Sequence, residues 1–131
     1  MMHNTMNIYK RNGRFAFDKG IKAEIIALSY FLKAGWILLQ KRARTPLGEI
    51  DLILKKEKYL LFVEVKCRKT LISAHFALNK KQQKRLFDAG NYWLASNMNL
   101  PYENARFDLF LIDQTGQFQH LENIILDDNN Y

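Results

Sequence analysis

The chain has 131 residues, a length typical of one domain, and 48% of them are hydrophobic, so a packed core can form. This composition excludes an intrinsically disordered chain. The net charge of +7 favours a polyanionic partner, and nucleic acid is the first candidate. A soluble protein that is merely basic would carry the same charge.

Cysteine content and hydropathy further limit the class of protein to which the chain can belong. Cys67 is the single cysteine, which excludes an intramolecular disulfide and a cysteine zinc cluster. The N-terminal residues show no secretory signal, and no segment approaches the roughly 18 apolar residues of a membrane span. We therefore expect no membrane association and a cytoplasmic location.

The chain begins with a polar, basic segment. Over residues 1–17 we expect a flexible arm that either contacts phosphates or is an inert terminus. Residues 18–34 are predicted to form a helix, which Gly35 ends. Its apolar positions recur three or four residues apart: Ile21, Ile25, Leu28 and Leu32. A strand over 36–40 and a basic connection over 41–47 follow.

The middle of the chain is predicted to form two neighbouring strands, over 49–54 and 59–67, joined by the polar turn KKEK at 55–58. The second strand is apolar on both faces before Glu64, which suits a central strand. We expect a loop over 69–78.

The last third of the chain is predicted to be a helix and a hairpin. The helix begins at Asn79, where Asn79 and Gln82 fit a capping box, and it ends near Asn97. The residues expected to face inward are Leu86, Ala89, Gly90, Trp93 and Leu94. Strands over 106–112 and 118–125 follow, joined by a turn over 113–116, and the tail at 127–131 is expected to be frayed.

The predicted order is therefore α-β-β-β-α-β-β within one domain over residues 18–126. This order indicates an α/β fold, with a central mixed sheet of about five strands and helices packed on it.

Charged residues inside the two central strands are the strongest functional signal. Asp51 lies in the first strand, and Glu64 and Lys66 lie in the second. Charged side chains are seldom buried unless they are paired or bind a metal. Because strand side chains alternate, Glu64 and Lys66 share one face, and Asp51 should face away from Ile50 and Leu52. Antiparallel pairing across the turn would then bring Asp51 close to Glu64.

Two neighbouring carboxylates repel each other, and a divalent cation would relieve that repulsion. Oxygen ligands suit Mg²⁺ or Mn²⁺, and the backbone carbonyl of Val65 could supply a third oxygen beside Asp51 and Glu64. Lys66 could orient a water molecule or neutralise charge on a phosphate. A structural ion pair, of Glu64 with Lys66 or of Asp51 with Arg44, is the alternative interpretation.

Two helical residues are candidates for the same site. Glu24 lies one turn from Ile21 and Leu28, where an apolar side chain is expected, and it could reach the carboxylates as a further metal or water ligand. An acid in an early helical turn also gains from the helix dipole. Gln83 leans toward the core side of its helix and could bond to the site or to a phosphate, or it could be a half-exposed surface residue.

Basic side chains surround these positions, and phosphate contact or simple solvation would explain them equally. The candidate nucleic-acid contacts are Arg44, Arg68, Lys69, Lys80, Lys81 and Lys84. Lys41, Arg42 and Arg85 belong to the same basic group.

In this chain an aspartate is followed, after twelve residues, by Glu-x-Lys, and a helical glutamate lies upstream. This pattern resembles the PD-(D/E)XK nuclease superfamily. More closely, the chain resembles the bacterial YraN family, which is similar to archaeal Holliday-junction resolvases. The resemblance covers residues 13–126. The segments that carry it are G-x-x-A-E at 20–24, Arg44 with GEIDLI at 48–53, FVEVKCR at 62–68, the stretch from Lys81 to Leu86, and RFDLF at 106–110.

The resemblance implies a restriction-endonuclease-like fold. It assigns Asp51 and Glu64 as metal carboxylates, Lys66 as the catalytic lysine and Glu24 as the helical acid, and Gln83 matches a glutamine of the resolvase branch. Ile50 stands where many relatives have proline, but proline supplies no ligand.

The expected function is that of a Mg²⁺- or Mn²⁺-dependent endonuclease acting on DNA, with branched or junction DNA as a candidate substrate. The resemblance to resolvases implies two active sites and hence a homodimer as a candidate acting form. The alternative is a non-catalytic nucleic-acid-binding or adaptor protein that keeps the fold.

Overall fold

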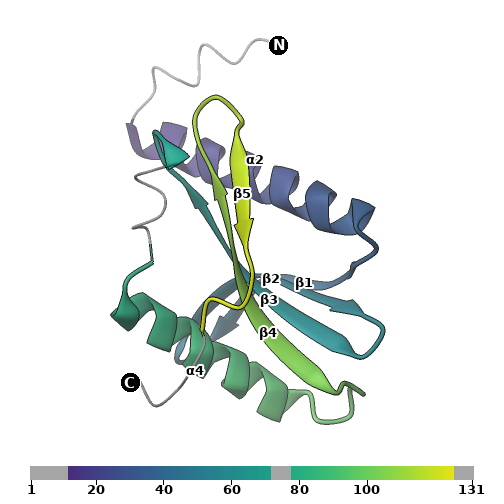
Figure 1. Ribbon diagram of the computed structural model, residues 1–131. Helices are drawn as coiled ribbons and strands as arrows, with labels where there is room; N and C mark the ends of the chain where they lie inside the picture. Colours follow the sequence, from purple (N-terminus) through teal and green to yellow (C-terminus); the bar gives the residue numbers. More distant parts are fainter. Residues whose placement is uncertain (1–11, 72–77, 126–131) are drawn as a thin grey trace.

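The computed structural model describes residues 12–71 and 78–125. The elements, in chain order, are α2 (Asn12–Lys33), β1 (Ile37–Thr45), β2 (Gly48–Lys56), β3 (Tyr59–Cys67), α4 (Lys80–Ser96), β4 (Asn104–Ile112) and β5 (Phe118–Leu121). The strands form one five-stranded sheet in the order β1-β2-β3-β4-β5, with β3 and β4 parallel and the other neighbours antiparallel. The two helices lie on opposite sides of the sheet (Figure 1). The predicted mixed α/β architecture is confirmed and is consistent with a nuclease-like fold.

Helix α2 begins earlier than the sequence predicts. Its first residue is Asn12, so the expected flexible arm over 1–17 is wrong for its last part, while residues 1–11 and the predicted frayed tail at 127–131 lie outside the described residues. A polar and basic composition does not prevent a helix here, because arginine and alanine are good helix formers and no proline interrupts the segment.

The buried face of α2 differs from the predicted one. Ala23, Ala27 and Phe31 are buried against the sheet, whereas Ile25 and Leu32 are 61% and 47% exposed. The periodicity of large apolar residues predicted a helix correctly, and Leu28 packs against the core as its place in that pattern suggests, but Ile25 and Leu32 face outward. Two alanines one turn apart allow the helix backbone to approach the sheet closely, and Phe31 fills the remaining space.

Gly35 ends α2 as predicted. It has a φ of +97°, a left-handed conformation that glycine adopts without steric cost. The N–H of Trp36 then returns to the carbonyl of Phe31. This sharp stop directs the chain straight into β1 at the edge of the sheet.

Strand β1 is longer than predicted. Its pairing with β2 continues from Ile37 to Thr45, so Lys41–Thr45, expected as a connection, are strand residues. An edge strand tolerates this basic sequence because its charged side chains can reach water. The hydroxyl of Thr45 closes the turn to β2 by accepting hydrogen bonds from the N–H groups of Leu47 and Gly48.

Helix α4 follows the prediction closely. Its capping box is formed: the Asn79 side chain accepts from the N–H of Gln82, and the Gln82 side chain accepts from the N–H of Asn79, both at 2.8 Å. The buried face consists of Leu86, Ala89, Gly90 and Trp93, with Leu94 packed beside them. A Cβ at Gly90 would lie 2.5 Å from Phe107, so glycine is needed for the helix to reach β4.

The C-terminal hairpin has the predicted turn but a shorter second strand. Gly116 has a φ of +92° in the turn, as expected. Strand β5 ends at Leu121 and not at 125, because Asn123 has a φ of +55° and its N–H bonds to the Asp108 carboxylate. The chain then crosses back toward α4, where Ile125 is buried.

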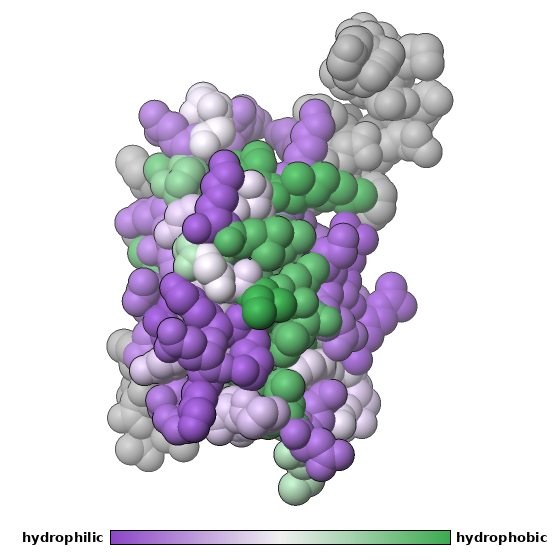
Figure 2. All heavy atoms as spheres, turned by 90° about the vertical axis from the view of Figure 1, so that its right-hand side faces the viewer, coloured by the Kyte–Doolittle hydropathy of each residue, from purple (hydrophilic) through white to green (hydrophobic). Residues whose placement is uncertain are grey.

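An apolar band remains on the outside of the molecule. Figure 2 shows apolar side chains running in a continuous band along the face that lies on the right of Figure 1. Among the exposed apolar residues of α2 and β1 are Ile25, Leu32, Ile37 and Leu39. No described helix is both long and apolar enough to cross a membrane.

A buried polar network joins β4, β5 and α2. Asp108 is fully buried and accepts two hydrogen bonds from Arg106, at 2.9 Å each, and one from the backbone N–H of Asn123. His120 contacts the same carboxylate at 2.6 Å and lies 3.0 Å from the hydroxyl of Tyr30. Arg106 is thus the ion-pair partner of the buried Asp108 carboxylate.

Burial alone would raise the pKa of Asp108, but hydrogen bonds from His120, Arg106 and Asn123 outweigh it and hold that pKa below its ordinary 3.8. The ionised form is therefore the one that the folded protein favours.

We predict that Asp108→Asn lowers the free energy of unfolding by about 2–4 kcal/mol at pH 7, because Arg106 loses a buried partner. Urea denaturation measures this difference. Since a lowered pKa stabilises the protein above the ordinary pKa, the difference should shrink as the pH falls below about 4. Asp88→Asn, which removes an exposed partner of Lys84, should cost about 0.5 kcal/mol or less. Equal losses in the two variants would contradict this role of Asp108.

Candidate functional site

The candidate site lies where β2 and β3 separate. The pairing of the two strands runs from Lys56 with Tyr59 to Leu52 with Val63 and ends there. Asp51 is the next residue of β2 beyond the last pair, and its Oδ2 accepts a hydrogen bond of 2.8 Å from the N–H of Val65. The carboxylate thus replaces the strand partner that β3 loses, and this bond fixes Asp51 at the fork between the strands.

The alternation of side chains along β2 is broken at Asp51. Leu52 packs in the core on the α2 side of the sheet, whereas Ile50 packs in the core on the α4 side. The prediction that Ile50 and Leu52 share a face is therefore wrong. On the neighbouring strand Arg42 stands opposite Asp51, between the pairs Lys41 with Leu52 and Ala43 with Ile50, and has a φ of +50°; the register shift of β1 lies earlier, between Leu38 and Gln40. The irregular backbone thus coincides with the point at which Asp51 reaches across to the N–H of Val65.

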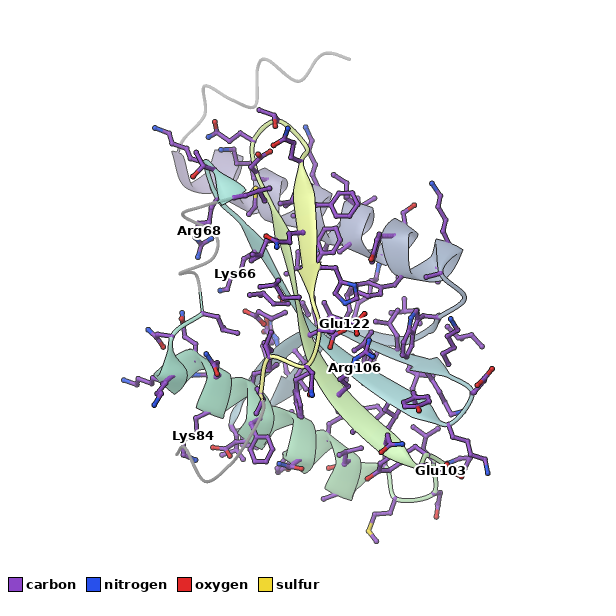
Figure 3. The ribbon with its side chains drawn as sticks, viewed as in Figure 1. Lys66, Arg68, Lys84, Glu103, Arg106 and Glu122 are labelled. Carbon is purple, nitrogen blue, oxygen red and sulfur yellow. The ribbon has the colours of Figure 1, made fainter. Side chains whose placement is uncertain are left out.

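Strand β3 keeps the predicted alternation. Glu64 and Lys66 face the α4 side, while Val63 and Val65 pack on the α2 side. The Lys66 ammonium lies 3.2 Å from the Glu64 carboxylate, and each side chain is about one-fifth exposed, at 20% and 18%. Figure 3 shows Lys66 and Arg68 projecting from the same part of β3, above the start of α4.

The Asp51 carboxyl is electrostatically unfavourable in its ionised form. Burial, followed by the negative charges of Glu64 and Glu24, raises its pKa from 3.8 to about 7. The hydrogen bond from Val65 favours the ionised form and partly opposes these effects. The site therefore holds more negative charge than its surroundings stabilise, a condition that a bound cation would relieve.

These groups surround a depression of about 180 Å³ between the sheet and α4. Its sheet side consists of Glu49, Asp51, Glu64 and Lys66, and its helix side consists of Leu78, Gln82, Arg85 and Leu86. Strands β2 and β3 supply the acids and α4 supplies the opposite wall.

Glu24 lies near the site but does not line the depression. Its charge contributes to the raised pKa of Asp51, while its own carboxylate pairs with Arg42 at 2.9 Å and is 17% exposed. The helical acid is thus close enough to Asp51 to act on it electrostatically, while its present partner is Arg42 of β1.

The position of Gln83 differs from the prediction in detail. Its amide donates to the carbonyl of Leu78 at 3.3 Å, and the neighbouring Gln82 lines the depression instead. A helix turns by about 100° for each residue, so a shift of one position decides which side chain faces the site.

The donor groups fit a small divalent cation with oxygen ligands. In the part of the chain that the structure describes, no three His, Cys, Asp or Glu side chains gather closely enough to hold an ion by themselves. An ion here would draw on Asp51 and Glu64 and on the carbonyl of Val65, because the N–H and C=O of one strand residue point the same way. Mg²⁺ suits such a partial set, since it usually retains several waters.

The basic residues expected to contact nucleic acid are at the surface, and some have partners. Arg44 pairs with Glu49 at 3.2 Å and Lys84 pairs with Asp88 at 2.9 Å, both in exposed positions. Lys84 points away from the sheet (Figure 3). Arg68, Lys69, Lys80 and Lys81 are exposed around the segment that joins β3 to α4.

Sequence reasoning did not select as site residues three polar residues that line the depression: Glu49, Gln82 and Arg85. Arg85 was expected only as one member of a basic group. Its spacing held the missing signal, because Gln82, Arg85 and Leu86 fall on one face of a helix and Leu86 was correctly predicted to face inward.

A larger hollow of about 250 Å³ lies elsewhere, lined mainly by α2 and by the end of β4. It contains Asp113, whose carboxylate is occupied by the N–H groups of Thr115 and Gln117 in the hairpin turn. The Asp113 carboxylate is thus occupied by hydrogen bonds within the turn. The smaller depression contains two neighbouring carboxylates, so it is the better candidate for a functional site.

We predict that Asp51→Asn stabilises the protein in metal-free buffer as the pH rises. A carboxyl whose pKa is raised to about 7 costs stability progressively from about pH 4 to pH 7, and an amide does not. The stability of the variant relative to the unsubstituted protein should increase by about 1–3 kcal/mol between pH 4.5 and pH 8. Urea denaturation in EDTA at both pH values measures this change. The exposed control Glu103→Gln should show no such trend. If the relative stability of Asp51→Asn does not change with pH, the raised pKa of Asp51 is refuted.

Comparison with known proteins identifies the family. The family model described as "Uncharacterised protein family UPF0102" matches residues 23–112. UPF0102 proteins of Nitrobacter winogradskyi and Bradyrhizobium diazoefficiens are 39% and 42% identical over 106 residues, which cover 81% of the chain and 90% and 80% of these relatives. A UPF0102 protein of Granulibacter bethesdensis is 40% identical over 111 residues, 85% of the chain and 70% of the relative. The chain therefore belongs to the UPF0102 family, which is the YraN family.

Proposed function

We propose that the protein is a Mg²⁺- or Mn²⁺-dependent endonuclease that hydrolyses DNA phosphodiester bonds, with branched or junction DNA as its candidate substrate. One observation carries the proposal: Asp51, Glu64 and Lys66 meet in one depression at the fork between β2 and β3. The raised pKa of Asp51 supports it, because a purely structural site gains nothing from an acid that resists ionisation.

Asp51 and Glu64 would hold the metal ion, together with the carbonyl of Val65. The ion would coordinate the scissile phosphate and lower the pKa of a bound water. The protein's part is to fix both carboxylates on strands. The bond from the N–H of Val65 sets the orientation of Asp51, and the partly buried pair with Lys66 sets that of Glu64.

Lys66 would orient the attacking water or neutralise charge on the phosphate as the bond breaks. Its present partner is Glu64, and a cation beside Glu64 would compete for that carboxylate and release the ammonium toward substrate. Glu24 would act as a further metal or water ligand after exchanging Arg42 for the site. Gln83 would act through the start of α4, because it holds the carbonyl of Leu78, which lines the depression.

The surrounding cations would bind the phosphate backbone of the substrate. We assign this role to Arg44, Arg68, Lys69, Lys80, Lys81 and Lys84. Arg68, Lys69, Lys80 and Lys81 are exposed on the segments that lead away from the depression along β3 and α4, so a bound strand would pass over them on its way to the acids.

Cutting both strands of a junction requires two active sites, and we propose that the acting form is a homodimer. The apolar band over α2 and β1 would supply its interface, since contiguous exposed apolar patches often mark contacts between proteins.

We predict that the protein cuts plasmid and four-way-junction DNA when Mg²⁺ or Mn²⁺ is present. Glu64→Ala should lower the rate by about 100-fold or more, because one ligand of the ion is lost. Gel analysis of end-labelled substrates measures the cleavage, and Glu103→Ala, at an exposed carboxylate far from the depression, is the control.

If no DNA is cut, or if Glu64→Ala cuts at the same rate as the unsubstituted protein, the nuclease proposal fails. Salt-sensitive binding without cleavage would instead identify a non-catalytic nucleic-acid-binding protein.

We also predict that light scattering shows a dimer whose dissociation constant rises at least about tenfold in Ile25→Glu and Ile37→Glu, because each change buries a charge in the interface. Met98→Glu changes an 82% exposed apolar residue outside α2 and β1 and serves as the matched control. A monomer at every concentration would exclude this assembly.

A further inference from the structure

Arg85 differs from Lys66, the other cation that lines the depression, and from the arginines paired with acids nearby. Lys66 pairs with Glu64, Arg44 with Glu49, and Arg42 with Glu24. Arg85 lines the depression that contains Glu49, Asp51 and Glu64, yet among the described residues it makes no ion pair or hydrogen bond with any of them. Arg85 is an exposed residue, and a guanidinium carries five N–H donors and stays charged.

Gly48 positions the stem of Arg85. A Cβ added to Gly48 would lie 2.8 Å from Cγ and 3.2 Å from Cδ of Arg85, so the arginine stem crosses the start of β2 at a distance that only glycine permits. Gly48 is itself fixed, because its N–H and its carbonyl both bond to the hydroxyl of Thr45 in the turn. The stem is thus held between a rigid turn and the first half of α4.

The helix face of Arg85 places it opposite the acids. Leu86, the next residue, is buried in the core between α4 and the sheet, and Gln82, one turn earlier, lines the same depression. Asp51 and Glu64 form the sheet side of the depression, and Arg85 belongs to the helix side. An anion between the two sides could therefore contact a cation held by the acids and the guanidinium at once.

We propose that Arg85 binds a phosphate of the substrate at the scissile bond or next to it, an inference that rests on the proposed function. A guanidinium offers two parallel N–H donors that match two phosphate oxygens, and it stays charged throughout the usual pH range. The role of Gly48 is to let the arginine stem lie flat so that these donors face the acids across the depression.

Three variants separate this role from simple packing. Arg85→Met keeps the aliphatic stem over Gly48 and removes the charge, Arg85→Lys keeps the charge and removes the fork, and Lys58→Met removes an equal charge at the distant turn between β2 and β3. Because Arg85 is exposed and methionine is a good helix former, Arg85→Met should leave the melting temperature within about 2 °C of the unsubstituted protein.

The experiment measures cleavage and binding separately. Cleavage of a four-way junction is followed in Mg²⁺. Binding of the same junction, with a fluorescent label, is followed in the Glu64→Ala background over a range of salt. We expect Arg85→Met to lower kcat/KM by about 30-fold or more, to weaken binding by about tenfold, and to reduce the slope of log Kd against log salt by about one contact. Arg85→Lys should fall between, and Lys58→Met should change each value by less than about twofold.

Each outcome decides the question. If the protein cuts DNA and Arg85→Met behaves as Lys58→Met does, the role of Arg85 is refuted while the nuclease proposal stands. If nothing is cut but Arg85→Met selectively weakens binding, the phosphate site stands and catalysis is refuted. If the protein neither cuts nor binds the junction, both proposals are wrong.

Discussion

The hydrogen bond from the N–H of Val65 to the carboxylate of Asp51 is the interaction on which the candidate site depends. Strands β2 and β3 share a ladder up to Leu52 and Val63 and then part, which would leave strand donors without partners. The Asp51 side chain takes the place of a strand as the partner of one of these donors, and the two strands stay apart beyond it. Because the acid is held by a backbone group, its position follows from the fold itself and not from a neighbouring side chain.

The same fork explains why the carboxylates of the site repel each other. Opening a sheet near its centre places polar groups between two packed layers, beside the depression. The acids are then close together and partly buried, and the folded protein accepts their repulsion because the cores on both faces stabilise the strands that carry them. The network around Asp108 has the opposite character, since every oxygen of that carboxylate has a donor.

Much of this could be predicted from the sequence. The order of elements, the capping box at Asn79, the stop at Gly35 and the shared face of Glu64 and Lys66 depend on local rules of periodicity and turn chemistry, which act within a few residues. The inward face of α2 could not be predicted in this way, because the choice of Ala23 and Ala27 over Ile25 depends on how closely the helix approaches the sheet. The positive φ of Arg42 and the place of Arg85 in the depression likewise depend on contacts between elements distant in sequence.

One irregular position relates three elements. Arg42 on β1 has a positive φ, stands opposite Asp51 of β2 and pairs with Glu24 on α2. Along β2 the alternation of side chains is broken at the same position, since Ile50 and Leu52 pack on different faces of the sheet. A local departure from the strand pattern, which has no sequence motif, thus accompanies the place where Asp51 accepts from the N–H of Val65 and where the charges of Glu64 and Glu24 act on it.

The role of Val65 has a consequence for how such a site can change over time. The group that holds Asp51 is a peptide N–H, which every amino acid except proline possesses. The side chain at position 65 is therefore constrained only by its packing on the α2 side, and substitutions there can accumulate without moving the acid. The side chain at position 65 can therefore vary with the packing of the α2 layer, while Glu64 and Lys66 on either side stay the same.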